Sequence, residues 1–318
     1  MYAGGMESQS LLLMGPRMLA WVTEQLPPLA PDAVLVRTTA GAVSVGTELP
    51  QYTGAARSPA PRGYPRMTGY ESVGVVVACG GAVHDVHPGD RVVAFYGHRT
   101  LAVVPDSKVI PVPDGISDAL ALLAILTCDV AKGIRTQAPR EDEPVLVTGA
   151  GAIGLLTIWV LRAYGVRAVD VVEPVAERRA LALALRLGAR QAWTPEDVPS
   201  AESYTVGFEC SSRDAAFHLL QRRVAAGGRI CVLADGNIEP LTLAPDFHRK
   251  ELTVVGSSDG WDYQEHARWY FARVQAGAPE LEAIFDDRVA ASALPEAFAR
   301  MASGERMPVK VLIDYNTG

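Results

Sequence analysis

Hydrophobic residues follow two different rhythms along the chain. From residue 10 to about 115, short apolar or alternating runs such as Leu11–Met14, Leu19–Thr23 and Ala33–Arg37 are separated by Gly and Pro turns. Short strands with such turn signals are typical of a distorted β-barrel. Further strands are expected at 74–78, 91–95, 101–104 and 108–111, and residues 50–69 are expected to form a long loop of the kind that is often functional.

From about residue 118, helical and strand patterns alternate. Apolar strands are expected near 145–148, 168–172, 191–193, 204–210, 229–234 and 251–256, with helices at 155–161, 175–187 and 213–224. This rhythm predicts an α/β fold with a doubly wound parallel sheet. Near residue 285 a strand, the helix 294–303 and the strand 309–314 indicate a return to the first domain. The expected domains are 1–117, 118–284 and 285–318.

A glycine-rich turn joins the first of these strands to its helix. Its residues are Gly149-Ala-Gly151-Ala152-Ile153-Gly154. In a dinucleotide site, the first glycine permits a tight turn, the second lets a pyrophosphate approach, and the third allows close helix–strand packing. The following helix N-terminus offers N–H groups to phosphate. The alternative is a glycine turn that serves packing alone.

Acidic and basic residues after the second strand bear on the choice of nucleotide. Glu173 stands at about the spacing expected of a ribose-binding acid, and a carboxylate there repels a 2′-phosphate, which favours NAD. Arg178 and Arg179 follow closely and could bind that phosphate, so NADP stays open. The ends of the later strands predict further cofactor contacts at Cys210, Ser211, Leu233, Ala234 and Ser257.

Composition narrows the class of protein. Of 318 residues, 49% are hydrophobic and 20% charged, with a net charge of −7, which disfavours nucleic acid and anionic membranes as partners. No apolar run approaches the ~20 residues of a membrane span, and the N-terminus lacks a secretion signal, so we expect a cytoplasmic protein. The four cysteines are dispersed, which supports neither a disulfide framework nor a zinc knuckle.

Several motifs together resemble the medium-chain dehydrogenase/reductase superfamily, the zinc alcohol dehydrogenases. They are Gly46-Thr47-Glu48, Gly69-Tyr70-Glu71-Ser-Val-Gly74, Pro88-Gly-Asp-Arg-Val92, the glycine turn and Lys310-Val-Leu-Ile-Asp314. The resemblance implies a GroES-like β-barrel catalytic domain and a Rossmann nucleotide-binding domain. It also implies hydride transfer between NAD(P) and a small alcohol or ketone, cofactor contacts at Thr127 and Lys310, and a homodimer or homotetramer.

The departures from the family pattern concern zinc. Where zinc members carry ligands, this chain has Val45, Tyr70 and, by alignment, Leu123, and the lobe with four cysteines is missing. Valine and leucine cannot ligate zinc, so we expect neither catalytic nor structural zinc. Glu71 and Cys128 remain as alternative metal ligands. The segment Gly63–Gly74 resembles a zinc-lacking branch that includes the dehydrogenase acting on the hydroxyethyl side chain of bacteriochlorophyllide.

Without zinc, side chains must handle the alcohol proton. By resemblance, Thr47 is the relay hydroxyl, although it could merely stabilise a turn. Tyr70 could donate a hydrogen bond, act as a base if its pKa is depressed, or only fill the place of zinc. His98 could shuttle a proton, but an exposed loop residue is the slightly favoured reading. We expect Glu71 in a structural ion pair or hydrogen bond, and Glu48 orienting Tyr70 or capping a turn.

The remaining histidines, at positions 84, 87, 218, 248 and 266, are expected on the surface. We therefore interpret the chain as a zinc-independent, NAD(P)-dependent oxidoreductase that acts on an alcohol/ketone pair. The alternatives are a quinone or enone reductase of the same superfamily and a protein that binds nucleotide without catalysis.

Overall fold

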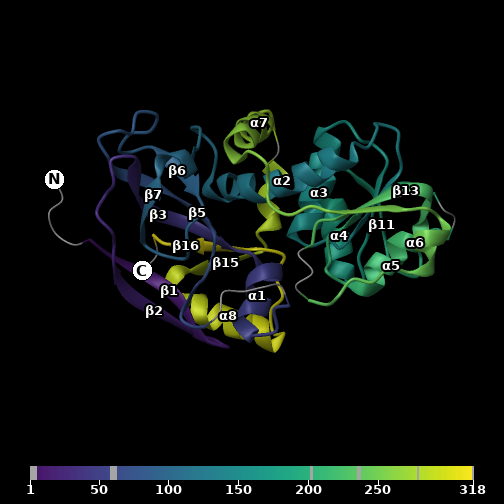
Figure 1. The fold of residues 1–318 in the computed structure, drawn as a ribbon, viewed down its shortest axis with the longest axis horizontal. Helices are drawn as coiled ribbons and strands as arrows, with labels where there is room; N and C mark the ends of the chain where they lie inside the picture. The colour runs from purple at the N-terminus through teal and green to yellow at the C-terminus, as the bar shows by residue number, and fades with distance from the viewer. Residues whose placement is uncertain (1–5, 58–62, 201–202, 235–237, 278, 317–318) are drawn as a thin grey trace. The chain divides into compact units, whose positions relative to one another are not determined.

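The computed structural model describes residues 6–57, 63–200, 203–234, 238–277 and 279–316, and the chain divides into two compact units (Figure 1). Unit 1 comprises residues 1–124, 267–277 and 285–318, and unit 2 comprises residues 125–266 and 278–284. Helices α2 (Asp118–Gln137) and α7 (Tyr263–Gln275) each contribute residues to both units. The division therefore falls within α2, whereas the sequence places it where this helix starts.

Unit 1 is built on two sheets. The larger has the order β15-β16-β3-β5-β6-β8, and the smaller has the order β2-β1-β4. Central β3 pairs with β5 along one edge, while β7 and β16 share the other edge. In Figure 1 the yellow C-terminal strands accordingly lie beside the purple and blue N-terminal ones. The strands are β1 (Glu7–Gly15), β2 (Met18–Gln25), β3 (Ala33–Val43), β4 (Arg66–Met67), β5 (Glu71–Cys79), β6 (Arg91–Ala94), β7 (Leu101–Pro105), β8 (Val109–Pro111), β15 (Asp287–Ala290) and β16 (Val311–Asp314).

All strands predicted in this part of the chain are present, and so is the predicted helix, α8 (Leu294–Ser303). The expected loop at 50–69 is wrong in its first residues, which belong to α1 (Val45–Thr53), and near its end, where the short strand β4 pairs with β1. This helix ends at Gly54, which adopts the left-handed conformation with φ +76°. Residues 58–62 of that loop lie outside the described residues.

A hydrophobic core fixes α1 in unit 1. Tyr52 of α1 packs against Phe298 of α8, with ring centroids 5.3 Å apart. Leu11 of β1 and Ile313 of β16 belong to the same buried cluster. The apolar residues of α8 recur at helical spacing, and this pattern is visible in the sequence. The contact of α8 with α1 joins segments that are far apart in the chain, so it is not visible there.

Unit 2 holds a six-stranded sheet in which every neighbouring pair is parallel. Its order, β11-β10-β9-β12-β13-β14, confirms the predicted doubly wound Rossmann fold. The strands are β9 (Val145–Thr148), β10 (Val169–Val172), β11 (Ala189–Trp193), β12 (Tyr204–Glu209), β13 (Val224–Val232) and β14 (Thr253–Gly256). The helices of this unit are α3 (Ala152–Ala163), α4 (Ala176–Ala184), α5 (Asp214–Arg223) and α6 (Pro245–Arg249).

The strand order reverses between β9 and β12, and at such a point a doubly wound sheet binds its ligand, beyond the carboxyl ends of the strands. Short 3₁₀ helices complete the chain: η1 (Asp106–Lys108), η2 (Pro279–Ile284) and η3 (Ala291–Ala293). Within the described ranges, no helix combines the length and the apolar character needed to cross a membrane.

Candidate functional site

The glycine loop between β9 and α3 has the geometry that a dinucleotide requires. Gly149 has φ +89°, and a Cβ on Gly154 would lie 1.8 Å from the carbonyl oxygen of Gly149. A Cβ on Gly151 would meet no described atom within 4 Å, so a pyrophosphate has room there. Gly151 is also the N-cap of α3, and no described side chain caps it. The N–H groups of Ala152 and Ile153 could therefore bind phosphate.

Glu173 is fixed beside this loop at the end of β10. One carboxylate oxygen accepts the N–H of Ala150 at 2.8 Å and the other accepts the N–H of Val175 at 2.9 Å, and the residue is 4% exposed. Arg179 donates to the carbonyl oxygens of Glu173 and of the following residue. Arg178 lies in the first turn of α4 and is partly exposed. The candidate ribose acid is thus bonded to the loop that would hold the phosphates.

Cys210 and Ser211 follow β12 and lie against the same loop. A Cβ on Gly149 would come within 3.1 Å of the Ser211 Cβ. The Ser211 hydroxyl and N–H donate to the carboxylate of Glu209. The Cys210 thiol lies 3.6 Å from the Thr157 hydroxyl, and burial raises its pKa well above the ordinary value, so it stays protonated.

The remaining candidate cofactor-binding residues follow the carboxyl ends of β13 and β14. Leu233 and Ala234 donate their N–H groups to the carbonyl oxygen of Glu209 at 2.9 and 3.1 Å. Ser257 donates its N–H to Val232 at 2.9 Å. The Ser257 hydroxyl oxygen is buried and has no partner among the described residues, so it could bind a ligand group.

Thr127 lies on α2, where its hydroxyl is 3.0 Å from Nε2 of His266. His266 is 2% exposed, so its expected place on the surface is wrong. Its ring packs edge-on against Trp261, with centroids 5.7 Å apart. Burial and, secondarily, the charge of Arg135 lower the pKa of His266 to about 4, so this imidazole is neutral at pH 7.

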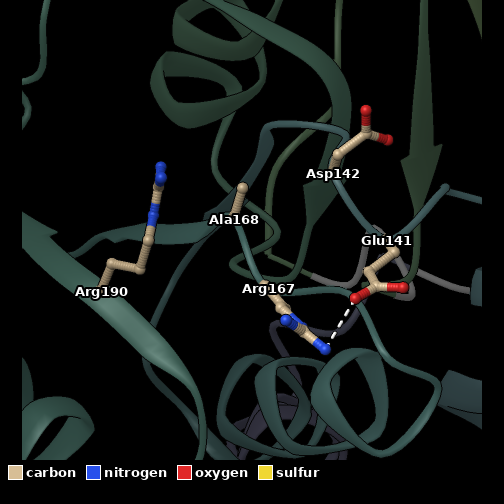
Figure 2. A pocket seen from close by; sticks show the side chains of 5 residues that line it. All are labelled: Glu141, Asp142, Arg167, Ala168 and Arg190. Atoms are coloured by element: carbon tan, nitrogen blue, oxygen red, sulfur yellow. Dashed lines mark ion pairs between the residues drawn. The ribbon is translucent and has the colours of Figure 1, made fainter.

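A hollow in unit 2 lies at the opposite ends of the strands, beside the amino ends of β9 and β10 (Figure 2). It is lined by Glu141, Asp142, Arg167, Ala168 and Arg190. Arg167 and Glu141 form an exposed ion pair at 2.8 Å, which Figure 2 shows as a dashed line. Its position away from the glycine loop separates it from the candidate cofactor site.

In unit 1, two hydroxyl side chains lie beside the phenol of Tyr70. Its phenol donates to the Ser44 hydroxyl at 2.7 Å and is also hydrogen-bonded to the Thr47 side chain. Burial, together with the negative charges of Glu71 and Glu48, raises the pKa of Tyr70 well above its ordinary value, although the two hydroxyl contacts lower it. Tyr70 is therefore a neutral hydrogen-bonding phenol, and the depressed pKa considered for a base is not found.

His98 lies next to this group but is enclosed by protein. It is 1% exposed, so the slightly favoured expectation of an exposed loop residue is wrong. Its Nε2 lies 3.0 Å from a carboxylate oxygen of Glu48. Glu48 also accepts the N–H groups of Ser44 at 2.9 Å and Gly69 at 3.0 Å. The carboxylate thus caps the start of α1, one of the two roles considered for it.

Glu71 forms a buried ion pair with Lys310, as the sequence interpretation favoured. Nζ of Lys310 lies 2.8 Å from one carboxylate oxygen, and both side chains are fully buried. The other oxygen has no partner among the described residues. Burial raises the pKa of Glu71, while Lys310 opposes this shift. Lys310, predicted to contact the cofactor, is engaged by this carboxylate.

Two functional contacts were not predicted. Ser44 lies two residues before the Gly46-Thr47-Glu48 motif, and nothing local indicated that its hydroxyl would meet a phenol twenty-six positions away. Glu209 falls within the predicted strand 204–210 and was not singled out as a site residue, although it accepts the N–H groups of both Ser211 and Ser212. A polar residue just before a helix is the one signal that could have drawn attention to Ser44.

Comparisons with known proteins agree with the folds of both units. Residues 30–114 match the alcohol dehydrogenase GroES-like domain. The L-threonine 3-dehydrogenase of Chelativorans sp. is 28% identical, over 91% of this chain and 93% of its own. A zinc-binding dehydrogenase of Sinorhizobium meliloti, described as putative and bound to NADP, superposes with a TM-score of 0.82 at 22% identity, over 97% of this chain and 99% of its own. The 2R,3R-butanediol dehydrogenase of Bacillus subtilis gives a TM-score of 0.81 at 20% identity, over 96% and 99%.

The chain belongs to the medium-chain dehydrogenase/reductase superfamily. It is an NAD(P)-dependent oxidoreductase, with a GroES-like unit and a Rossmann unit. The residues of the glycine loop fit the nucleotide that the superfamily uses.

The positions that align with the zinc ligands of zinc-type members carry side chains that do not fit a zinc ion in this chain. Val45 and Leu123 offer only hydrocarbon, and Tyr70 is a neutral phenol. Of the alternative ligands, Glu71 is paired with Lys310. Burial raises the pKa of Cys128 to about 12, which opposes the thiolate form that zinc binds. The described residues contain no group of three His, Cys, Asp or Glu side chains that could hold a metal.

The buried His266 predicts a pH dependence of stability. Its pKa of about 4 lies below the ordinary 6.5, so the unfolded chain takes up the proton first and stability falls as the pH drops from 6.5 towards 4. Between pH 7.5 and 5 we expect its contribution to fall by about 2 kcal/mol. Urea unfolding of His266→Gln should show a correspondingly shallower pH slope, while exposed His248→Gln keeps the wild-type slope. Equal slopes in wild type and His266→Gln would contradict the assignment.

Two glycines of the loop should respond differently to alanine. Gly151→Ala should leave the melting temperature unchanged but weaken NADH or NADPH binding by roughly 10-fold or more, because its methyl group enters the space for the pyrophosphate. Gly154→Ala should lower the melting temperature as well, because its methyl group meets the Gly149 carbonyl. Calorimetry and nucleotide fluorescence titration measure the two effects. Full nucleotide affinity in Gly151→Ala would count against this site.

Proposed function

We propose that this enzyme transfers hydride between NAD(P) and an alcohol/ketone pair without a zinc ion. The observation that carries the proposal is the hydroxyl group at the former ligand position: Tyr70 bonded to Ser44 at 2.7 Å and to Thr47. With a ketone bound, the Ser44 hydroxyl would donate to the Tyr70 oxygen, and the single phenolic proton would be donated to the carbonyl oxygen. That is the polarising task that zinc performs in its relatives. That relatives are named threonine, butanediol and alcohol dehydrogenases supports an alcohol substrate.

Alcohol oxidation removes a hydride from carbon and a proton from oxygen, giving a ketone, reduced nicotinamide and a proton. When bound, the nicotinamide supplies or accepts the hydride. Thr47 and Tyr70 would hold the substrate oxygen, and the bonded hydroxyls of Thr47, Tyr70 and Ser44 offer a path for its proton. Ser44 is partly exposed, so this path can end in solvent. In ketone reduction the same hydroxyls would donate instead.

The nucleotide would be held by the loop Gly149–Gly154, with Glu173 as the group that selects it. Glu173 is anchored by the Ala150 N–H, so its negative charge stays where a 2′-phosphate would lie. Arg179, a candidate counter-charge, is bonded to backbone carbonyls. These contacts favour NAD over NADP as the working cofactor.

An enone or quinone reductase is the second candidate. A neutral Tyr70 would stabilise the oxygen of an enolate as well as that of an alkoxide. Matched pairs of saturated ketones and enones, assayed with NADH and with NADPH, separate the two functions. Turnover of ketones and of the corresponding alcohols supports the proposal. Turnover confined to conjugated substrates would replace it by the second candidate.

Removal of the two hydroxyls tests the mechanism. Tyr70→Phe and Thr47→Ala should each lower kcat by ~10-fold or more, because each removes a donor to the substrate oxygen. Tyr64→Phe is the matched control, since Tyr64 is an exposed phenol that lies over Arg66 and should keep wild-type turnover. Steady-state kinetics on the best substrate of the panel gives the result. Wild-type kcat in both variants would remove these hydroxyls from the reaction.

Substitution of the acid after β10 tests the nucleotide preference. Glu173→Gln keeps an oxygen for the Ala150 N–H but loses the charge, so the ratio of NADH to NADPH affinity should fall by roughly 10-fold or more. The exposed Glu177→Gln on the same segment should leave the ratio unchanged. Fluorescence titration with both nucleotides measures it. A wild-type preference for NADPH would contradict the role given to Glu173.

A further inference from the structure

The Glu48 carboxylate joins three separate segments of unit 1. One oxygen accepts the N–H of Ser44, at the start of α1. The other accepts the N–H of Gly69, just before β5, and lies 3.0 Å from Nε2 of His98, in the loop after β6. Glu48 is 6% exposed, so these donors take the place of water around its charge. A buried carboxylate with three donors is held in one position.

These contacts fix Tyr70 at both of its ends. Its backbone follows Gly69, whose N–H is bonded to Glu48. Its hydroxyl is bonded to Ser44, whose N–H is bonded to the same carboxylate. The phenol therefore spans two anchor points that one side chain holds. Movement of Glu48 would displace the Tyr70 hydroxyl.

His98 is built to hold this carboxylate. Since a carboxylate oxygen accepts, Nε2 of His98 carries the proton of the 3.0 Å contact. The ring lies directly over Gly69, where an added Cβ would be 2.4 Å from Nδ1, and Nδ1 has no partner among the described residues. The backbone N–H of His98 is bonded to Thr68 at 2.7 Å. Neither ring nitrogen faces solvent, so positioning suits His98 better than proton shuttling.

We propose that Glu48, held by His98, is a positioning residue that keeps the Tyr70 hydroxyl aligned for the substrate oxygen, acting through Ser44 and Gly69. In zinc-type relatives the metal fixes the electrophile in place. In this chain, the hydrogen bonds of the Glu48 carboxylate and the His98 imidazole would fix the position of Tyr70 instead. The inference rests on the proposed function, because it requires Tyr70 to act on the substrate.

A double-mutant cycle between Glu48 and Tyr70 tests the proposal. Glu48→Gln replaces one acceptor oxygen by an NH2 group that cannot accept, so kcat should fall by ~10-fold or more with little change in KM. In the Tyr70→Phe background the same change should alter kcat by less than about 2-fold, because the aligned hydroxyl is already gone. Equal losses in both backgrounds would overturn the proposal, since a merely structural role of Glu48 is indifferent to the Tyr70 hydroxyl.

Substitutions of His98 provide an independent route if Glu48→Gln unfolds. His98→Gln retains an N–H donor and should lose roughly 3-fold in kcat, whereas His98→Phe should lose ~10-fold or more, and only when Tyr70 is present. Exposed Glu296→Gln should behave as wild type. Melting temperature and NADH affinity confirm that each variant is folded. Equal activity of His98→Gln and His98→Phe would also overturn the proposal.

The outcomes separate this inference from the proposed function. If Tyr70→Phe alone retains wild-type kcat, the role of Tyr70 in the reaction fails and the positioning role fails with it. If Tyr70→Phe loses activity but the two substitutions act additively, only the positioning role fails.

Discussion

Three buried glutamates, each bonded to backbone N–H groups, hold the loops of the two candidate sites in this chain. Glu48 binds the start of α1 and the turn before Tyr70, and Glu173 binds the glycine loop. Glu209 binds the turn after β12. A carboxylate removed from water requires such donors, and removal of one partner leaves an unbalanced charge. The loops therefore depend on polar contacts of fixed geometry more than on local apolar packing.

The proposed replacement of a metal by hydroxyl groups would alter what holds the substrate oxygen. A zinc ion would impose its own geometry on its ligands, while hydroxyl groups take their direction from their neighbours. In unit 1 these neighbours are Ser44 and Thr47. Burial, together with the charges of Glu71 and Glu48, raises the pKa of Tyr70 and keeps it protonated. The Tyr70 phenol is therefore a hydrogen-bond donor at neutral pH. The neutral imidazole of His266 shows the same effect of burial in unit 2.

Much of the fold and part of the candidate sites could be predicted from the sequence. The six parallel strands and the glycine loop follow from hydrophobic periodicity and residue type, and the unfitness of Val45 and Leu123 as zinc ligands follows from their chemistry. The burial of His98 could not be predicted, because its partner Glu48 lies fifty residues away. The raised pKa of Tyr70 depends likewise on burial and on side chains from two segments, residues 44–48 and Glu71. Periodicity reports local structure, whereas these properties arise from contacts between distant parts of the chain.

The central claim is that hydroxyl groups perform the work of the metal. Its most direct test is the metal content of the active enzyme, measured by mass spectrometry together with turnover before and after exhaustive chelation. The account predicts less than about 0.1 zinc per chain and unchanged turnover, because the described part of the chain holds no group of three His, Cys, Asp or Glu side chains that could bind the ion. About one zinc per chain, with activity lost on chelation and restored by zinc, would contradict it.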